Sequence, residues 1–393
     1  MINGVYSMTS FNNPIVEIPV LLRGLTFDGE KGLFVHTLPP DAKQPASLEL
    51  AAVADGVEAS IEAWRRQLEA YYAEHSTFPA IVSVAGQDLR MGLGASFDEA
   101  AAGEGVSVRP GVAGSTDRGD VVRGKIALVT GGAQGFGEGM VRGLCDCGAF
   151  VYIADMNVAG ARKLADALNA SAGRTVAAGL AVNVTDEASV IAMMDEVAAH
   201  TGGLDVFISN AGVLRAGSVK TMALKDFQFV TSVDYTGFFL CSKHASVQLA
   251  LQNLPSRAYY TDLIAISSKS GLEGSNKNGA YSGAKFGTLG LAQSYALELV
   301  TDNIKVNAVC PGNFLDGPLW SDPEKGLFVQ YLNAGKVPGA KTVADVRRFY
   351  ESKVPMNRGC RTEDVLRAIC YIIEQKYETG QAVPVTGGQV MLN

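Results

Sequence analysis

Three residues that could transfer a proton lie close together in the stretch SSKSGLEGSNKNGAYSGAK: Ser268, Tyr281 and Lys285. Tyr281 and Lys285 are four positions apart in a segment with helical character, so we expect both side chains on one face of a helix. A cation beside a tyrosine stabilises the phenolate, and the phenol can then serve as a general acid or base. Ser268 ends the apolar run DLIAISS, where its hydroxyl can orient a substrate oxygen. Ser267 is the alternative for that role.

A glycine-rich turn upstream could hold a dinucleotide. In KIALVTGGAQGFGEGM an apolar run leads into Thr130, Gly131, Gly135 and Gly137. Glycines let the backbone approach a pyrophosphate at the amide end of the following helix. Asp155 ends the next apolar run, about 20 residues further on, where a carboxylate accepts hydrogen bonds from ribose hydroxyls. Its charge would repel a 2′-phosphate, which favours NAD over NADP, although Arg162 and Lys163 lie nearby. The other interpretation of Asp155 is a helix N-cap.

Seven apolar runs alternate with helical segments over the rest of the chain. They are KIALVTG, FVYIADM, VAAGLAVNV, LDVFISNAG, DLIAISS, IKVNAVCPG and AVPVTGG. This alternation predicts βαβ units and an α/β fold, a Rossmann-type doubly wound parallel sheet of about seven strands.

The segment 103–120 is rich in glycine, serine and charge and separates two regions of different texture. We therefore expect a small N-terminal α/β module at 1–105, a linker at 106–120 and an NAD-binding catalytic domain at 121–393. Within the module, 46–75 has helical periodicity and predicts one long helix or two. Residues 79–102 indicate a strand, a turn and the start of a helix.

Composition limits the possible partners. The 393 residues carry a formal charge of −7 without a basic block, which argues against nucleic acid or an anionic membrane as partner. The six cysteines lie in apolar or helical segments without a signal peptide, which favours reduced thiols and a cytoplasmic protein without disulfides. Cys145 and Cys147 lack a second Cys or His pair and the four histidines are scattered, so we expect no catalytic metal.

Taken together, the motifs resemble the short-chain dehydrogenase/reductase family. The resemblance covers about 121–393 and rests on the turn at 130–137, N-A-G at 210–212, Ser268, Tyr281, Lys285 and P-G at 311–312. It implies an NAD-dependent oxidoreductase acting on CH–OH groups, in which Lys285 also binds the nicotinamide ribose. The implied cofactor contacts are Thr130, Gly131, Gln134, Gly135, Phe136, Gly137, Asp155, Met156, Asn183, Val184, Asn210, Ala211, Gly212, Tyr281, Lys285, Pro311, Gly312 and Asn313.

Two positions depart from the family pattern. Asn183 stands where an aspartate commonly meets the adenine, and its amide can make an equivalent hydrogen bond. Asp234 stands where an asparagine usually supports a water chain to the lysine. We include Asp234 among the catalytic residues, since a carboxylate can hold that water, but it alters the charge around Lys285.

Several loops resemble family members that oxidise sorbitol 6-phosphate: SKSGLEGSNKNGAYSGAKFG, PGNFLDGPLW, KVPMNRGC and TGQAVPVTGGQVML. They imply conversion of D-sorbitol 6-phosphate to D-fructose 6-phosphate with NAD. A dianionic phosphate needs cations, and these loops contain Lys269, Lys277, Lys353 and Arg358. Lys269 and Arg358 are our first candidates for the phosphate contact.

Other interpretations stay open. The substrate could be a non-phosphorylated polyol or another carbonyl compound of ketoacyl type, and an inactive NAD-binding sensor or scaffold is an alternative of another class. Family members usually associate through two long helices, here within 222–253 and 281–300, which implies a homodimer or homotetramer. Residues 79–100 are faintly similar to the segment preceding the dehydrogenase half in fusions with a class II sugar-phosphate aldolase. The N-terminal region lacks that enzyme's histidine cluster, so we interpret it as a non-catalytic remnant or interface module.

Overall fold

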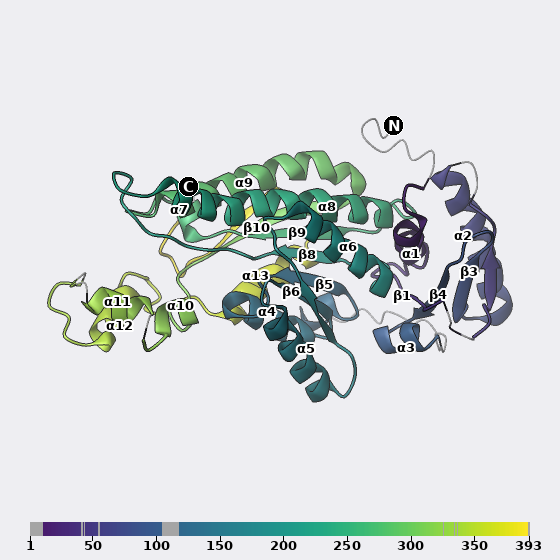
Figure 1. The fold of residues 1–393 in the computed structure, drawn as a ribbon, viewed down its shortest axis with the longest axis horizontal. Coiled ribbons are helices and arrows are strands. Elements are labelled where there is room, and N and C mark those ends of the chain that lie inside the picture. The colour runs from purple at the N-terminus through teal and green to yellow at the C-terminus, as the bar shows by residue number, and fades with distance from the viewer. Residues whose placement is uncertain are drawn as a thin grey trace.

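The computed structural model describes residues 11–40, 42, 44–53, 56–103, 118–324, 326–333, 335 and 337–391. Most of the expected linker at 106–120 therefore lies outside the described residues. The chain resumes with a 3₁₀ turn, Arg118–Val122. Two β-sheets are formed, one on each side of this segment in the sequence (Figure 1).

The larger sheet has seven parallel strands in the order β11-β10-β9-β8-β5-β6-β7. The strands are β5 (Ile126–Thr130), β6 (Phe150–Asp155), β7 (Ala177–Ala181), β8 (Val206–Ser209), β9 (Thr261–Ile266), β10 (Ile304–Pro311) and β11 (Ala382–Val385). Six lie within the apolar runs and β9 begins one residue before DLIAISS, because strands covered on both faces need continuous apolar sequence. The predicted doubly wound parallel fold is confirmed.

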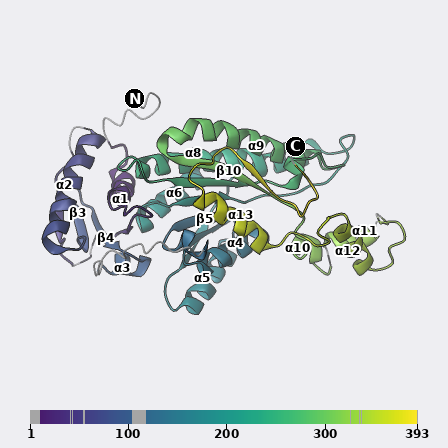
Figure 2. The same cartoon turned by 180° about the vertical axis from the view of Figure 1, so that it is seen from behind.

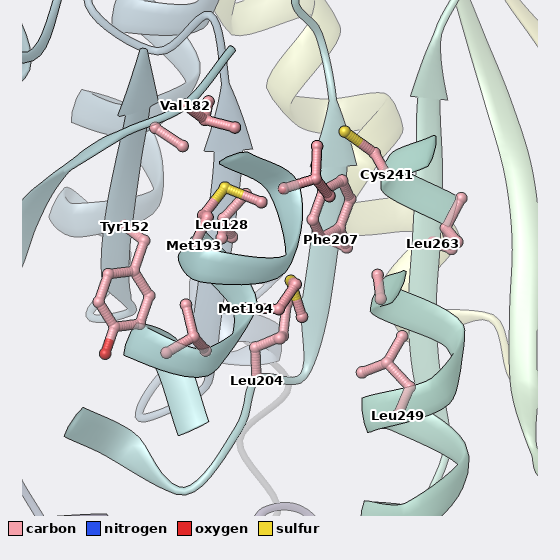
Figure 3. Packing of buried hydrophobic residues seen from close by; sticks show 14 of the residues in the cluster. Leu128, Tyr152, Val182, Met193, Met194, Leu204, Phe207, Cys241, Leu249 and Leu263 are labelled. Carbon is pink, nitrogen blue, oxygen red and sulfur yellow. The ribbon is translucent and has the colours of Figure 1, made fainter. Parts of the chain in front are cut away.

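Helices cover both faces of this sheet (Figures 1 and 2). One layer consists of α4 (Gly135–Asp146), α5 (Val158–Ala172) and α13 (Thr362–Glu374), and the other of α6 (Glu187–Thr201), α8 (Gly237–Asn253) and α9 (Gly279–Leu299). Figure 3 shows the second layer from close by, with Phe207 and Leu263 of the sheet near Met194 of α6 and Leu249 of α8.

The helix that leads into α8 is irregular. α7 (Leu224–Thr231) continues into a π-helical turn, Ser232–Thr236, before α8 begins. A π-helical turn has one residue more than an α-helical turn and is frequent at functional sites. Asp234 lies in this turn and is buried.

A small helical lobe follows β10, beyond the carboxyl ends of the strands. It contains α10 (Pro318–Ser321), α11 (Leu327–Asn333) and α12 (Val343–Ser352). The lobe has a core of its own, formed by Leu315, Trp320, Phe328, Val337 and Val346. In Figures 1 and 2 it lies at the end of the molecule opposite the N-terminal module.

The N-terminal module is a four-stranded sheet with three helices. The elements are α1 (Pro14–Leu25), β1 (Phe34–Thr37), β2 (Leu48–Leu50), α2 (Val57–His75), β3 (Ile81–Val84), β4 (Arg90–Gly94) and α3 (Phe97–Ala102), with strand order β1-β4-β3-β2.

Three strands of this module were not expected: β1 lies where the sequence indicated no element, and the other two are β2 and β4. Residues 48–50 form β2 rather than helix, and 90–94 form β4 where we expected a turn. β4 contains two glycines because α3 packs directly on it: a Cβ at Gly92 would lie 2.0 Å from the Ala100 carbonyl oxygen, and one at Gly94 would lie 2.4 Å from the Ala100 nitrogen. Glycine is depleted in strands, so the sequence pattern of residues 90–94 does not predict one.

The module packs against the larger domain at the amino-terminal ends of the large sheet's strands. α1 lies against α6 and α8, and Ala198 and Leu251 of those helices belong to the module's own core cluster. Conversely, Phe34 of β1 belongs to the core cluster under α6 and α8. Each part therefore contributes apolar side chains to the core of the other. Within the described residues, no helix is both long and apolar enough to traverse a bilayer.

Candidate active site

The structure brings Tyr281 and Lys285 together near Ser268. Tyr281 lies in the first turn of α9, and Lys285 follows one turn later on the same face. Lys285 is buried, and its Nζ lies 5.6 Å from the centroid of the Tyr281 ring. The same Nζ donates a 2.9 Å hydrogen bond to the carbonyl oxygen of Ile266, the last residue of β9. This bond fixes the ammonium group at the carboxyl end of the strand that precedes Ser268.

The two neighbouring serines have different environments. Ser267 is buried, and its hydroxyl donates a 3.1 Å hydrogen bond to the Lys285 carbonyl oxygen. Ser268 is partly exposed, and its Oγ accepts a 3.1 Å hydrogen bond from the Ser270 amide. Because this contact uses Ser268 Oγ as an acceptor, its hydroxyl can still donate to a bound oxygen. The geometry favours Ser268 over Ser267 as the group that meets a substrate.

Asp234 faces Lys285 across the buried site. Its Oδ2 lies 3.5 Å from Lys285 Nζ, and its Oδ1 accepts a 2.7 Å hydrogen bond from the Val213 amide. Burial lowers the pKa of Lys285, but Asp234, Tyr281 and Cys310 together outweigh burial and hold that pKa above its usual range. Lys285 therefore stays charged, but as part of an ion pair.

The glycine turn joins β5 to α4 in a conformation that needs its glycines. Gly131 and Gly135 both have φ of +63°, which disfavours other residues. A Cβ at Gly137 would lie 2.0 Å from the Gly131 carbonyl oxygen. Asn210 holds the turn from the end of β8: its Nδ2 donates to the carbonyl oxygens of Thr130 and Gly131 at 3.0 and 3.1 Å.

The amino end of α4 fits a bound phosphate group. Gln134 at the N-cap makes no side-chain hydrogen bond to the first helical amides. A Cβ at Gly135 would meet no atom within 4 Å, so the first residue of α4 has open space beside it. Free amides at a helix amino end attract anions, and the residues present thus fit the pyrophosphate of a dinucleotide.

Asp155 ends β6 beside this turn. Its Oδ2 accepts a 3.1 Å hydrogen bond from the Ala133 amide, and its Oδ1 accepts one of 2.9 Å from the Asn157 amide. The N-cap of α5 is Asn157 rather than Asp155. A carboxylate has about four acceptor positions, so Asp155 keeps capacity for ribose hydroxyls. Arg162 and Lys163 are exposed on α5.

The remaining expected cofactor residues follow other strands at the same edge. Met156 is largely exposed after β6, and Asn183 follows β7 with its Oδ1 accepting from Thr185. The neighbouring Val184 is buried against Gly237. Ala211 and Gly212 follow β8, and Pro311, Gly312 and Asn313 end or follow β10. All of them lie at the carboxyl edge of the sheet, where parallel α/β sheets bind ligands.

The structure adds two residues that the sequence did not indicate. Phe314 stacks on Phe136 of the glycine turn, with ring centroids 4.5 Å apart, and so connects the β10 loop to the turn. Thr288 donates a 3.3 Å hydrogen bond to the Asp234 carbonyl oxygen and so ties the π-helical turn to α9. Thr288 is three residues after Lys285, and that helical spacing is a signal from which it could have been found.

The candidate phosphate ligands differ in availability. Lys269 directly follows Ser268 and is half-buried. Burial lowers the pKa of Lys269, and the nearby charge of Lys353 lowers it further, while Glu273 has the opposite effect. The Lys353 ammonium lies over the Phe349 ring, 4.3 Å from its centroid. Arg358 is committed elsewhere, with hydrogen bonds of 2.5 and 2.9 Å to the Asp364 carboxylate. Lys277 is exposed.

The cysteines and histidines form no obvious metal centre. In the part of the chain that the structure describes, no three His, Cys, Asp or Glu side chains are grouped as metal ligands. Burial raises the pKa of Cys145 to about 12, so its thiol does not readily form the thiolate that metals prefer.

Comparison with known proteins agrees with this geometry. Residues 125–322 match the family model described as short chain dehydrogenase. Sorbitol-6-phosphate 2-dehydrogenase of Escherichia coli is 36% identical over 270 residues, 68% of this chain and 99% of that protein. Cis-4-hydroxycyclohexanecarboxylate dehydrogenase of Sinomonas cyclohexanicum is 33% identical over 273 residues, 69% and 98% of the two chains.

A solved structure gives the same result. The crystal structure of sorbitol-6-phosphate 2-dehydrogenase from Erwinia amylovora aligns with a TM-score of 0.62 at 38% identity, covering 68% of this chain and all of that one. The matched proteins are oxidoreductases that act on CH–OH groups, and the family uses a nicotinamide cofactor. This chain belongs to the short-chain dehydrogenase/reductase family.

Proposed function

We propose that the protein is an NAD-dependent dehydrogenase that interconverts a sugar-alcohol phosphate and a ketose phosphate, with D-sorbitol 6-phosphate and D-fructose 6-phosphate as the pair. The observation that carries this proposal is the 36% identity that extends over 99% of a sorbitol-6-phosphate 2-dehydrogenase. A likeness over nearly the whole length includes the loops that enclose the substrate.

In this proposal Tyr281 takes the proton of the reacting hydroxyl during oxidation and returns it during reduction. Ser268 donates a hydrogen bond to the substrate oxygen and keeps it beside the phenol. Lys285 supplies the positive charge that favours the phenolate. A nicotinamide, when bound, supplies the hydride acceptor or donor. Tyr281 and Lys285 would also contact its ribose.

We propose NAD rather than NADP as the cofactor. Asp155 supports this preference, because an added 2′-phosphate would place negative charge beside its carboxylate. Replacing Asp155 with Ser should raise the use of NADP relative to NAD. An unchanged ratio of kcat/KM for the two cofactors would contradict the proposed role.

For the phosphate we propose Lys269 together with Lys353, rather than Arg358. Lys269 directly follows Ser268, and the charge of Lys353 acts on it. The Arg358 guanidinium is already paired with Asp364. Two lysines of like charge near one another are favourable when an anion lies between them.

A dehydrogenase of a non-phosphorylated hydroxy compound is the second candidate. It is favoured by the 33% identity over 98% of a cis-4-hydroxycyclohexanecarboxylate dehydrogenase, whose name gives a substrate with a carboxylate and no phosphate. The same lysines could meet that carboxylate. An inactive sensor is less favoured, because Tyr281, Lys285 and Ser268 are all present around one site.

We extend the proposal to assembly, location and the N-terminal region. Exposed apolar side chains on α8 and α9, Phe239, Val247, Phe286 and Leu297, would be covered in a homodimer or homotetramer. Reduced thiols suit the cytoplasm. We assign residues 1–105 no catalytic role, since the described part of this region packs at the strand ends opposite the site.

The test is formation of NADH from NAD, or of NADPH from NADP, by the purified protein with sorbitol, mannitol, their 6-phosphates and cis-4-hydroxycyclohexanecarboxylate. A strong preference for sorbitol 6-phosphate with NAD would support the proposal. Equal rates with free polyols would contradict the proposed contact with a substrate phosphate. A preference for the hydroxycarboxylate would establish the second candidate, and cofactor binding without turnover on any substrate would favour the sensor.

A further inference from the structure

The pairing of Asp234 with Lys285 distinguishes this site. The two side chains are 0% and 6% exposed, and their charged atoms are 3.5 Å apart. Within the described residues, no group makes a regular hydrogen bond to Asp234 Oδ2, which faces the lysine. In a buried site the attraction between two opposite charges at this distance is strong, because little water screens it.

The geometry of the pair is fixed from four sides. Lys285 Nζ is held by the Ile266 carbonyl oxygen, and Asp234 Oδ1 is held by the Val213 amide. The Asp234 backbone carbonyl accepts a hydrogen bond from Thr288. A Cβ at Gly212 would lie 3.4 Å from both Asp234 Oδ2 and Lys285 Nζ, so the loop after β8 closes over the pair. Neither partner can turn away without breaking one of these contacts.

The titratable groups facing Lys285 are few. They are Tyr281 on its own helix, Asp234 on the π-helical turn and Cys310 on β10. Burial raises the pKa of Cys310 to about 11, so its thiol is neutral near pH 7. Burial raises the pKa of Asp234, and the charge of Lys285 opposes that rise. When the Asp234 carboxylate is ionised, its charge and that of Lys285 nearly cancel at Tyr281.

A neutral pair stabilises the Tyr281 phenolate less than a lone ammonium would. In carbonyl reduction, the carbonyl carbon gains a hydride from the reduced nicotinamide and its oxygen gains the Tyr281 proton, which leaves an alcohol and a phenolate. Oxidation is the reverse and begins from the phenolate. The protonated phenol thus suits reduction, and the phenolate suits oxidation.

We infer that Asp234 is a positioning residue that, by pairing with Lys285, offsets the positive charge beside Tyr281, fits the site to ketone reduction and moves alcohol oxidation to alkaline pH. This inference rests on the proposed acid–base role of Tyr281. It assigns Asp234 no contact with the substrate. Its effect passes through the charge of Lys285.

The first test needs only the wild-type enzyme. Oxidation, followed as kcat/KM for the best alcohol substrate, should rise steeply between about pH 7 and pH 9, while reduction should be maximal near or below neutral pH. An oxidation rate that has already reached its plateau at about pH 7 would overturn the inference.

The second test replaces the charge. Asp234→Asn, nearly the same shape, should move the midpoint of the oxidation profile to lower pH by about one unit and leave the KM for NAD unchanged. If that variant does not fold, as judged by circular dichroism, Asp234→Ser carries the same expectation. A folded variant with an unchanged midpoint, or one that loses both directions at every pH, would contradict the inference.

Asp262→Asn is the matched control. Asp262 is also a buried aspartate with a lysine partner, Lys305 at 2.8 Å, but it lies at the opposite end of β9. Its replacement should lower stability without moving the pH midpoint. Tyr281→Phe separates this inference from the proposed function. If Tyr281→Phe retains turnover, Tyr281 is not the acid–base group and the proposed function fails. If Tyr281→Phe loses turnover but Asp234→Asn leaves the pH midpoint unchanged, only the proposed role of Asp234 fails.

Discussion

Arg23 of α1 donates a 2.6 Å hydrogen bond to Asp205, which directly precedes β8, and both side chains are fully buried. Asp205 also accepts hydrogen bonds from the Tyr259 hydroxyl at 2.6 Å and the Ile126 amide at 2.7 Å. The arginine in turn donates to the carbonyl oxygen of Leu33 at 2.8 Å. A residue of the N-terminal module therefore neutralises a carboxylate inside the catalytic domain.

Replacing Arg23 with Met should destabilise the whole protein by about 3–5 kcal/mol, because the carboxylate of Asp205 would remain buried without its cation. Urea unfolding followed by circular dichroism measures the change. Arg142→Met is the control, since it removes an exposed pair with Glu138 and should have little effect. Equal stability of the two variants would show that the module is not held through this contact.

The same contact predicts sensitivity to acid. Burial raises the pKa of Asp205, but Arg23, Lys125, Tyr259 and the Ile126 amide outweigh burial and hold it below the usual range. A lowered pKa stabilises the fold fully above the unfolded value of about 4, and this contribution is lost as the pH falls through the lower folded value. Comparing wild type with Asp205→Asn by urea unfolding between about pH 3 and pH 7 should show a stability difference that shrinks in acid. A difference that does not vary with pH would argue against the pairing.

The two adjacent serines should respond differently to the same change. Ser268→Ala should lower kcat/KM by about a hundredfold, because a donor to the substrate oxygen is lost. Ser267→Ala removes the hydrogen bond to the Lys285 carbonyl and should cost about 1 kcal/mol of stability, with a smaller kinetic effect. Steady-state kinetics and thermal unfolding of both variants check this order. The reverse order would exchange their roles.

Lys269→Met should raise the KM for a phosphorylated substrate by about tenfold to a hundredfold, the usual effect of losing a charge-assisted hydrogen bond. The KM for NAD should not change. Lys277→Met, in the same loop but exposed, is the control and should behave like wild type. Inorganic phosphate should compete with the substrate in wild type and much less in Lys269→Met; equal competition would place the phosphate elsewhere.

Much of the fold could be predicted because a parallel sheet imposes long apolar runs and a fixed direction on its strands. That direction also explains why Thr130, Asp155 and Pro311, far apart in sequence, all lie at one edge. Strands β2 and β4 of the module could not be predicted, since Leu48–Leu50 has three residues and Arg90–Gly94 contains two glycines that serve close packing. Long-range polar contacts leave no local pattern either: Arg23 and Asp205 are 182 positions apart.

The π-helical turn at Ser232–Thr236 makes the position of Asp234 depend on chain length. Consecutive helical residues differ by about 100° in direction, so removing one residue there would rotate α7 by that angle relative to α8. Asp234 could then no longer face Lys285 while α7 kept its present contacts with α9. The extra residue of the π-helical turn therefore sets the direction of the Asp234 side chain. In a straight α-helix without that residue, the same carboxylate would point away from Lys285.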